Sequence, residues 1–503
     1  MGIPSYFNFI LKNHKNIIIN KKNIICDYLF IDSNSLIYDS IHELESIDDY
    51  SVVYNLVYNK ILDLIKINNP TNKTYVCFDG LPPYPKIIQQ KQRRFKSLIT
   101  NKILNKKGWS TNNITPGTDF MIKLDEFLHI KFKNDKNIYL SGSSEEGEGE
   151  HKICSIIRNN IDKYNNSKNV IYGLDADLIM LGLLLSTKLS CIYLYKETTH
   201  FSYLPFIDNN EEYYFNLKKL AFEIDNTLEN YNIKQSVYDY CLICFLCGND
   251  FLPHLPAINI RNNGIFYLIE KYKQFIKQNK LYLINNNEEN IQWDNFRKFI
   301  LTLSNEEDDK IKENILWKLN LNDKIKPYTY EDKLNLLPCV DNEKEKYLLQ
   351  NMDSYNSYIL NNVNSKEVSL NYLKMIEWTW KYYLGFNVCN NIFYNYFYGP
   401  LLNDIKNFIP IYNNVELINT DNDKESINTY TQLLYVLPYN NHKEIIPKNI
   451  YNKISGCYNK FPILKETNYE IEYFLCKYFW ESHIHLEHID IYELNKEINQ
   501  LIN

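Results

Sequence analysis

Acidic residues recur in the first half of this chain at the ends of short apolar runs. The run LFI ends at Asp32, TYVCF ends at Asp79, NIYL leads into the loop SGSSEEGEGE, and NVIYGL leads into Asp175. Short apolar runs of this kind are typical of buried strands. In an open α/β sheet the carboxyl ends of parallel strands meet at one edge, where ligands bind. Asp250 follows a longer, helix-like apolar run and is expected at the same edge. We therefore expect seven carboxylates to converge there: Asp32, Asp79, Glu148, Glu150, Asp175, Asp177 and Asp250.

Carboxylates that gather without a counter-ion repel one another and raise each other's pKa. Hard divalent cations that prefer oxygen ligands, Mg²⁺ or Mn²⁺, turn such a cluster into a binding site. Gly147 and Gly149 would keep side-chain bulk away from the ions, whereas Glu145 and Glu146 are expected to be loop charge only. Two simpler interpretations stay open: a charge run is often a solvated loop, and Asp175 or Asp177 would suit a helix N-terminus.

The stretch PKIIQQKQRRFKS carries a second set of chemically active residues. Lys86, Gln90, Arg93 and Arg94 stand at offsets that fall on one helical face at about 100° per residue. Arginine suits bidentate contact with phosphate, and two of the chain's five arginines are adjacent here. The face predicts a phosphate pocket. An exposed basic helix face is the alternative.

The elements that must position these residues follow from the apolar pattern. Up to about residue 280, apolar runs alternate with helix-like stretches, which is typical of an α/β sheet domain. Residues 281–370 are rich in Asn and acids and predict helices joined by exposed loops, and residues 371–503 are dense in aromatics. We expect three regions with these bounds: 1–280, 281–370 and 371–503. The predicted strands are Tyr28–Ile31, Thr74–Phe78, Asn137–Leu140, Asn169–Tyr172 and Cys191–Tyr195.

Composition narrows the class of protein. The chain has 503 residues, 45% of them hydrophobic, and a formal charge of −6, so a polyanion must be held by a local basic patch. No apolar run approaches the roughly 18 residues of a membrane span, and we expect a cytoplasmic protein that is a monomer by default, with unknown protein partners. Cys241, Cys244 and Cys247 lie in an apolar run and predict reduced cysteines of a buried helix rather than a zinc motif.

Several ordered motifs resemble those of the XRN-family 5′-to-3′ exoribonucleases. These are MGIPSYF, FIDSNSLIY, FDGLPPYPKIIQQKQRRFKS, ITPGTDFM, GEGEHKI, YGLDADLIMLGL and CFLCGNDFLPHLP. YTQLLYVLP and KYFWESHIHLEHIDI are weaker echoes of the family's second conserved region. The compact form and the bias toward Asn, Lys, Ile and Tyr would fit a large DNA virus or a protist.

The resemblance implies a fold, an activity and site residues. The fold would be a PIN-like nuclease core, shared with flap endonucleases, with a central, mostly parallel sheet flanked by helices and a mainly helical second region. The activity would be Mg²⁺-dependent, processive degradation of single-stranded RNA from a 5′-monophosphate to mononucleotides, with two metal ions. The seven acids match the family's metal ligands, and Lys86, Gln90, Arg93 and Arg94 match its pocket for the 5′-monophosphate. A flap-type or DNA-directed 5′ nuclease and an inactive RNA-binding relative remain alternatives.

The chain also departs from the family pattern. Tyr38 replaces the family's histidine in the first motif and is expected to stack on a base. In the aromatic stretch, both of the family's tryptophans are lost, to Asn390 and Ile392. Phe393, Tyr394 and Trp378 are the candidates to replace them.

Four histidines and one lysine complete the candidates. His151 and Lys152 follow Glu150 and are candidates for substrate contact. His483, His485 and His488 are expected on the solvated face of a polar, helix-like stretch.

Overall fold

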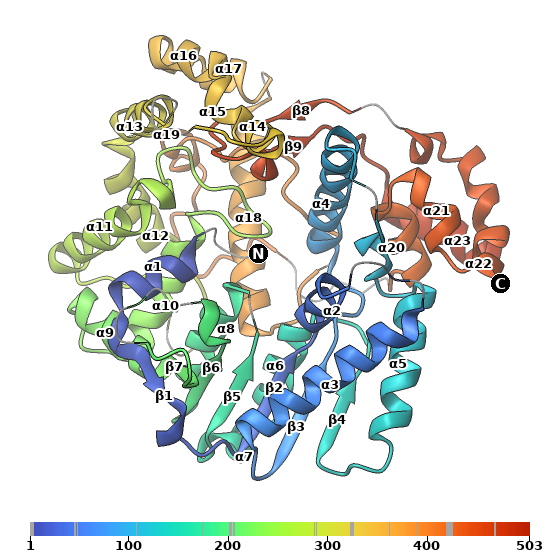
Figure 1. Cartoon of the computed structure of the whole chain (residues 1–503). Helices are drawn as coiled ribbons and strands as arrows, with labels where there is room; N and C mark the ends of the chain where they lie inside the picture. Colours follow the sequence, from blue (N-terminus) through green and yellow to red (C-terminus); the bar gives the residue numbers. More distant parts are fainter. Residues whose placement is uncertain are drawn as a thin grey trace.

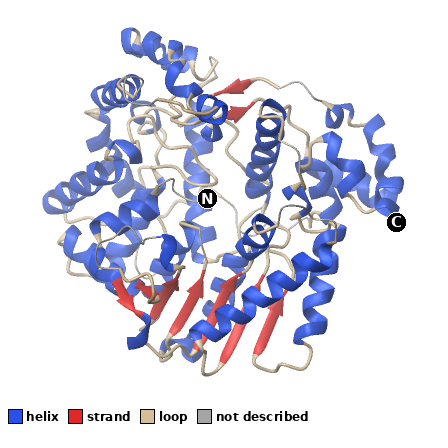
Figure 2. Cartoon of the chain, in the orientation of Figure 1, coloured by secondary structure: helices blue, strands red, loops and turns tan. Residues whose placement is uncertain are grey.

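The computed structural model describes residues 5–502 except for 45–46, 48, 107, 174, 201–203, 205–206, 286, 288, 322–325, 362, 390, 419–425 and 467–468. Within this part of the chain, a seven-stranded sheet with the order β1-β7-β6-β5-β2-β3-β4 is surrounded by helices (Figure 1, Figure 2). The strands are β1 Ile18–Asn20, β2 Tyr28–Asp32, β3 Lys73–Cys77, β4 Ile138–Ser141, β5 Asn169–Tyr172, β6 Ile192–Tyr195 and β7 Tyr213–Asn216.

The five strands β2 to β6 pair in parallel, whereas β7 runs antiparallel to both β6 and β1. The expectation of a mostly parallel α/β sheet is therefore confirmed, and all five predicted strands form, each within a residue of its expected bounds. The strands β1 and β7, at one end of the sheet, were not predicted. They are only three and four residues long, too short for a periodic signal to stand out.

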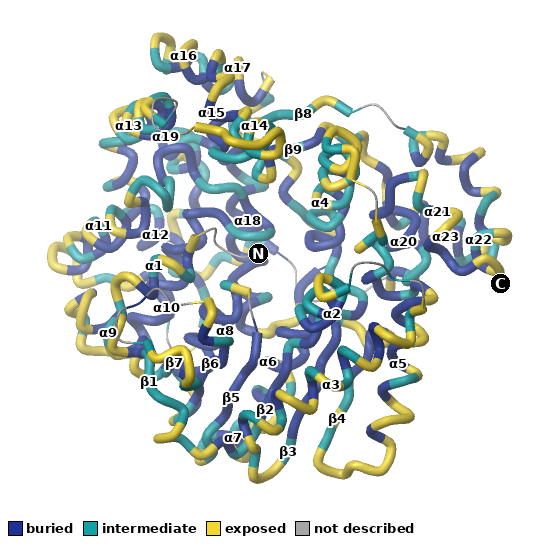
Figure 3. Tube along the Cα trace, viewed as in Figure 1, coloured by how far each residue is buried: buried dark blue, intermediate teal, exposed yellow. Residues whose placement is uncertain are grey.

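Side chains alternate between the two faces of the central strands. On β2, Phe30 points to one hydrophobic core, whereas Leu29 and Ile31 point to the other. On β5, Ile171 shares the core of Phe30, and Val170 lies on the opposite face. This alternation is the period of two that a strand imposes. Strands β2, β3, β5 and β6 are largely buried, as Figure 3 shows, whereas β4 at the edge of the sheet is more exposed.

The two faces are covered by helices from the first half of the chain. Helices α2, α3 and α5 cover the face of Leu29 and Ile31, and α6, α8 and α9 cover the other. The helices of this part are α1 Tyr6–Asn13, α2 Asn34–His42, α3 Tyr50–Asn68, α4 Tyr84–Ile103, α5 Asp119–Phe132, α6 Gly149–Arg158, α7 Ile161–Asn165, α8 Asp177–Ser186, α9 Leu217–Leu228, α10 Ile233–Phe245 and α11 Gly264–Asn279.

Residues 281–370 form short helices joined by loops, as the sequence predicts. The boundaries at 280 and 370 stay predictions. Helix α18 crosses residue 370 and packs on α8 in the main core. The helices between residue 281 and the end of α18 are α12 Trp293–Ser304, α13 Glu307–Leu319, α14 Tyr330–Asn335, α15 Leu337–Val340, α16 Glu343–Gln350, α17 Tyr355–Tyr358 and α18 Ser365–Leu384.

The C-terminal helices form a third hydrophobic core against α4. Tyr84 and Ile87 of α4 pack with Leu433, Leu494 and Ile498, so α4 stands between this unit and the rest of the molecule (Figure 1). The helices of this unit are α20 Thr429–Val436, α21 Tyr439–Ile445, α22 Lys448–Ile454 and α23 Ile491–Ile502. The remaining elements are α19 Leu402–Ile405, which packs in the main core, and a hairpin of β8 Ile471–Glu472 and β9 His483–Ile484.

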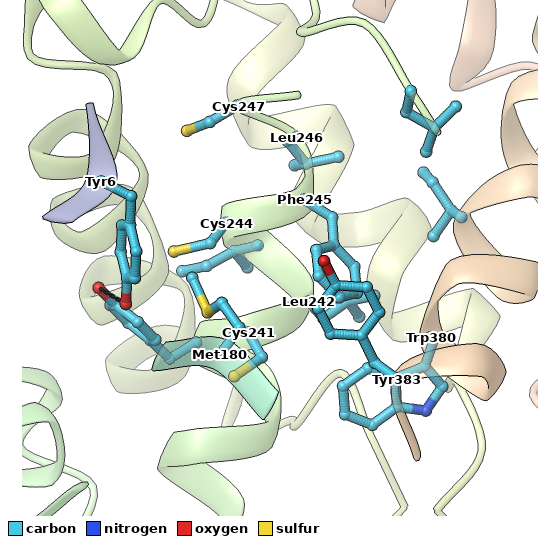
Figure 4. Packing of buried hydrophobic residues seen from close by; sticks show 14 of the residues in the cluster. Tyr6, Met180, Cys241, Leu242, Cys244, Phe245, Leu246, Cys247, Trp380 and Tyr383 are labelled. Atoms are coloured by element: carbon cyan, nitrogen blue, oxygen red, sulfur yellow. Dashed lines mark hydrogen bonds between the residues drawn. The ribbon is translucent and has the colours of Figure 1, made fainter. Parts of the chain in front are cut away.

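Cys241, Cys244 and Cys247 are buried free cysteines within and just beyond the buried helix α10. Figure 4 shows them against Tyr6, whose hydroxyl donates to Tyr240 at 3.1 Å. The expectation that these cysteines lie in a buried, helical part of the core is confirmed for Cys241 and Cys244, and Cys247 is buried just beyond the helix. No helix among the described residues is long and apolar enough to cross a lipid bilayer.

We expect Ile171→Ala to lower the free energy of unfolding by about 2–5 kcal/mol, because it removes buried methyl groups from the central strand and leaves a cavity. Ile171 is fully buried. The matched control is Ile130→Ala on α5, since Ile130 is 74% exposed, and its effect should stay within about 0.5 kcal/mol. Urea denaturation of both variants checks this, and equal losses would contradict the packing described for β5.

Candidate active site

The carboxyl ends of the parallel strands, together with the loops and helices that follow them, carry the predicted acids. Asp32 is the last residue of β2, and Asp79 lies two residues beyond β3. The remaining acids sit as follows: Glu148 is the N-cap of α6, Glu150 lies in its first turn, Asp175 follows β5, Asp177 begins α8, and Asp250 lies in the loop after α10.

Asp32, Asp79 and Asp175 are close enough to act on one another. Burial raises the pKa of Asp32 well above its usual range, and the carboxylates of Asp79, Asp175 and Glu148 add to the shift. Burial also raises the pKa of Asp79 to about 6, and Glu148 is the next cause. These shifts are what like charges produce when they share a poorly solvated site.

The other acids belong to the same cluster. Burial, followed by the charge of Asp250, raises the pKa of Asp177 to about 7. Burial raises the pKa of Glu150 well above its usual range, with Asp177 and Glu148 as the next causes. The structure therefore brings together all seven acids that the sequence singles out. A simple solvated loop does not account for Glu148 or Glu150, which are both buried.

Lys86 lies among these carboxylates. Its Nζ is 2.6 Å from Glu148 Oε1 and 2.6 Å from Asp250 Oδ2, and all three side chains are buried. Burial opposes the charge on Lys86, but the two acids raise its pKa well above the usual range. In turn, burial opposes ionisation of Asp250, but Lys86 and Arg93 hold its pKa well below the usual range. Lys86 was predicted for a phosphate pocket, and in this structure it is a counter-charge for the acids.

Asp79 is fixed by hydrogen bonds to both of its oxygens. The Gly149 N–H donates to Oδ1 at 2.7 Å, and the Asn34 side-chain amide donates to Oδ2 at 2.6 Å. Asn34 Oδ1 also accepts from the Asp79 N–H at 3.1 Å. A Cβ at Gly149 would lie 2.5 Å from Asp32 Oδ1, so this position has no room for any side chain. Asn34, in the motif FIDSNSLIY, was not predicted as a site residue.

Lys152, which follows the GEGE loop, bonds to the main chain just beyond β3 and β4. The Lys152 ammonium donates to the carbonyls of Phe78 and Gly142, each at 2.8 Å. Lys152 is thus an anchor between the ends of β3 and β4, and its role as a substrate contact is not supported. Glu145 and Glu146 are exposed, in line with the expectation of loop charge. His151, unlike Lys152, faces the acids. One of its ring nitrogens lies within 4.8 Å of carboxylate oxygens of Glu148 and Glu150.

Two tyrosines of α18 reach the acids from a distant part of the chain. The Tyr382 hydroxyl donates to Glu148 Oε2 at 3.0 Å, and Tyr383 lies close enough to Asp177 for that carboxylate to raise its pKa, after burial as the larger cause. Neither residue was predicted. The adjacent pair in EWTWKYYLGF is visible in the sequence, but nothing in its spacing connects it to acids more than 200 residues away.

The basic face of α4 lies next to the acidic cluster. Arg93 is exposed, and Arg94 donates to Asn112 Oδ1 at 3.2 Å. Gln90 Oε1 accepts from the side-chain amide of Gln432 at 3.0 Å. Burial lowers the pKa of Arg94 to about 10, and the nearby Tyr38 opposes that shift. Tyr38, the predicted stacking residue, is therefore placed beside this face.

The candidates to replace the lost tryptophans differ in their surroundings. Trp378 is fully buried and its Nε1 donates to the Cys389 carbonyl at 2.8 Å, so its ring is not accessible to a base. Tyr394 is also buried. Phe393 is partly exposed and Ile392 packs on the main core, and Asn390 lies outside the described residues. Of the three candidates only Phe393 has an accessible ring.

A cavity of about 1480 Å³ opens beside the acids, between α4, the loop after α10 and the β9 segment. Arg93, Asp250 and Phe393 are among the lining residues. On one side, the Gln92 side chain of α4 donates to the Ile484 carbonyl at 2.8 Å and accepts from its N–H at 2.9 Å. These two hydrogen bonds fasten β9 to α4.

The prediction that His483 lies on a solvated helical face is wrong. His483 begins the strand β9, and its ring stacks on Phe397 with centroids 4.9 Å apart. Burial lowers its pKa to about 3. His485 lies against the edge of the same phenyl ring at 4.8 Å, and His488 packs on Phe393 at 5.3 Å. His485 and His488 are exposed, as expected, but they lie in the loop after β9 rather than in a helix.

Comparison with known proteins connects this geometry to a family. Residues 1–197 match the model described as XRN 5′-3′ exonuclease N-terminus, and residues 230–333 match the Xrn1 helical domain. The catalytic core of Rad2 in complex with DNA substrate, a solved structure, aligns with 66% of this chain and 85% of its own at 14% identity, with a TM-score of 0.33, a distant similarity.

Three curated relatives carry the name 5′-3′ exoribonuclease 1. The Saccharomyces cerevisiae protein is 31% identical over 61% of this chain, the human protein 29% over 60%, and the Schizosaccharomyces pombe protein 29% over 70%. The aligned part spans only 23%, 20% and 30% of these relatives, respectively. The two family models together match more than half of the chain, in the order of the family. The chain therefore belongs to the XRN family of 5′-3′ exonucleases.

Proposed function

We propose that the chain is a metal-dependent, processive 5′-to-3′ exoribonuclease that degrades single-stranded RNA with a 5′-monophosphate to mononucleotides. The observation that carries this proposal is the position of Lys86, which links two groups of residues. Its ammonium contacts Glu148 and Asp250, and its helix continues directly into Gln90, Arg93 and Arg94. A phosphate bound by that face would lie beside the acids.

The acidic cluster fits hard divalent cations. Its donors are carboxylate oxygens, which Mg²⁺ and Mn²⁺ prefer. Glu150 Oε2 and Asp177 Oδ1 are buried and have no hydrogen-bond partner among the described residues, and a cation would satisfy both. Bound metal ions would activate a water molecule and stabilise charge on the scissile phosphate. The residues proposed to hold them are Asp32, Asp79, Glu148, Glu150, Asp175, Asp177 and Asp250.

The chain's own groups would orient the RNA. Arg93 and Arg94 offer planar guanidinium groups for the terminal phosphate, and Gln90 offers its amide. With the 5′ end held at a fixed distance from the acids, each cut would release one nucleotide. A triphosphate or a cap would exceed a pocket that fits one phosphate. Tyr38, beside Arg94, is proposed to stack on the first base.

A flap-type or DNA-directed 5′ nuclease is the second candidate, because it would use the same seven acids. The α4 face favours the exoribonuclease, since Gln90, Arg93 and Arg94 follow Lys86 on the same helix. An inactive RNA-binding relative is the third, and the presence of all seven acids argues against it. Parallel assays on RNA and on flap DNA distinguish the first two candidates.

We expect Asp177→Asn to reduce Mg²⁺-dependent mononucleotide release from 5′-monophosphate RNA by at least about 100-fold, because losing even an outer partner of a metal ligand costs about 10- to 100-fold. The matched control is Asp162→Asn, the same change at an exposed residue of α7, which should keep wild-type activity. Wild-type rates in Asp177→Asn would contradict the proposed metal site, and faster cleavage of flap DNA than of RNA would favour the second candidate.

We expect Arg93→Gln to slow degradation of 5′-monophosphate RNA by about 10- to 100-fold, since a charge-assisted hydrogen bond contributes about 1.5–3 kcal/mol. The slow rate on 5′-hydroxyl RNA should not change, because that end offers no phosphate. Lys102→Gln, which removes one charge from an exposed position of the same helix, serves as the control. Equal slowing on both RNA ends would mean that Arg93 does not read the 5′-phosphate.

A further inference from the structure

The acids and the two tyrosines beside them come from widely separated parts of the sequence. All seven acids precede residue 251, whereas α18 begins at Ser365. At the end of this helix, Tyr382 donates to Glu148 Oε2 at 3.0 Å, and Tyr383 lies beside Asp177. Consecutive residues of one helix thus lie beside two different carboxylates.

The ring of Tyr382 is held on both faces. It stacks on Trp378 with centroids 4.9 Å apart and an interplanar angle of 21°, and on His151 at 3.9 Å and 27°. The ring of Phe251 meets it edge-on at 5.5 Å. Trp378 is itself fixed by its hydrogen bond to the Cys389 carbonyl. This stack leaves the Tyr382 hydroxyl little freedom, so the oxygen of Glu148 that it contacts is fixed as well.

Tyr383 is held by different contacts. Its ring is buried and packs edge-on against Phe245 of α10 at 5.0 Å (Figure 4). Its backbone carbonyl accepts a hydrogen bond from the Arg158 guanidinium. Arg158 is the last residue of α6, the helix whose first turn contains Glu150. The C-terminal end of α18 is therefore tied to the helix that carries part of the acidic cluster.

The two phenols leave one oxygen of each carboxylate to other groups. Glu148 Oε1 faces Lys86 rather than Tyr382, and Asp177 Oδ1 has no partner among the described residues. A phenol has one proton to donate and adds no charge, so it can orient a carboxylate without neutralising it. Outer hydrogen-bond partners of this kind orient metal ligands and tune their affinity.

We infer that Tyr382 and Tyr383 are positioning residues of the acidic cluster, which fix the orientation of Glu148 and Asp177 for divalent cations. This inference rests on the proposed function only in taking the cluster to be a metal site. The aromatic stretch after residue 370 then has a task in the nuclease centre itself, in addition to packing on the core.

The test is the binding of Mn²⁺ to the full chain without RNA, measured by calorimetry and by electron paramagnetic resonance. We expect Tyr382→Phe and Tyr383→Phe each to weaken Mn²⁺ binding by roughly tenfold. The matched control is Tyr54→Phe, which removes a buried hydroxyl that donates to the Phe120 carbonyl at 3.2 Å. It should bind Mn²⁺ like the wild type, and thermal melting of all three variants verifies that they fold.

A double-mutant cycle separates positioning from general loosening of the fold. If Tyr382 acts through Glu148, then Tyr382→Phe should have no further effect on Mn²⁺ binding in a Glu148→Gln background. Wild-type Mn²⁺ affinity in both single Tyr→Phe variants, or a full additional loss in the Glu148→Gln background, would overturn the inference. Weakened Mn²⁺ binding in the Tyr→Phe variants, together with no hydrolysis of RNA by the wild type, would support the positioning role and reject the proposed function.

Discussion

The mutual repulsion of seven carboxylates at one sheet edge is the constraint on which much of this structure depends. Burial and like charges raise the pKa of Asp32, Asp79, Glu150 and Asp177, so the acids resist ionisation where they stand. A fold that keeps them together must supply donors and positive charge nearby. The Lys86 ammonium, the N–H of Gly149, the Asn34 amide and two phenols do so.

These compensating groups explain the arrangement of the helices. Helix α4 leaves the same edge as Asp79 and brings Lys86 back among the acids, and α6 begins at that edge so that its first N–H reaches Asp79. Helix α18 ends where its two tyrosines meet Glu148 and Asp177. The site thus draws on three helices that lie far apart in the sequence, and the sheet serves as the common base for all of them.

The sequence predicts the acids and the central strands well, because short buried strands that end in a carboxylate leave a local pattern. Interactions between residues that are far apart in the sequence leave no such local pattern. Lys86 shares a helical face with Arg93. Only the packing of α4 shows that the Lys86 ammonium points toward the acids. Lys152 follows Glu150 in a motif of charged residues, yet its ammonium is used by two backbone carbonyls. Tyr382 and Tyr383 lie in an aromatic stretch, where nothing in the sequence distinguishes them from the neighbouring aromatic residues. His483 is in a two-residue strand rather than a helix.

The separation between the acids and their tyrosine partners also has a consequence for the order of synthesis. Asp250 and Tyr383 are 133 residues apart, and a ribosome adds about 5–20 residues per second. Roughly 7 to 27 seconds therefore pass between completion of the acid set and arrival of the phenols. During this interval the nascent sheet domain carries all of its carboxylates but lacks the contacts from α18. The centre seen in the folded chain is completed only after α18 has been made and has packed on α8.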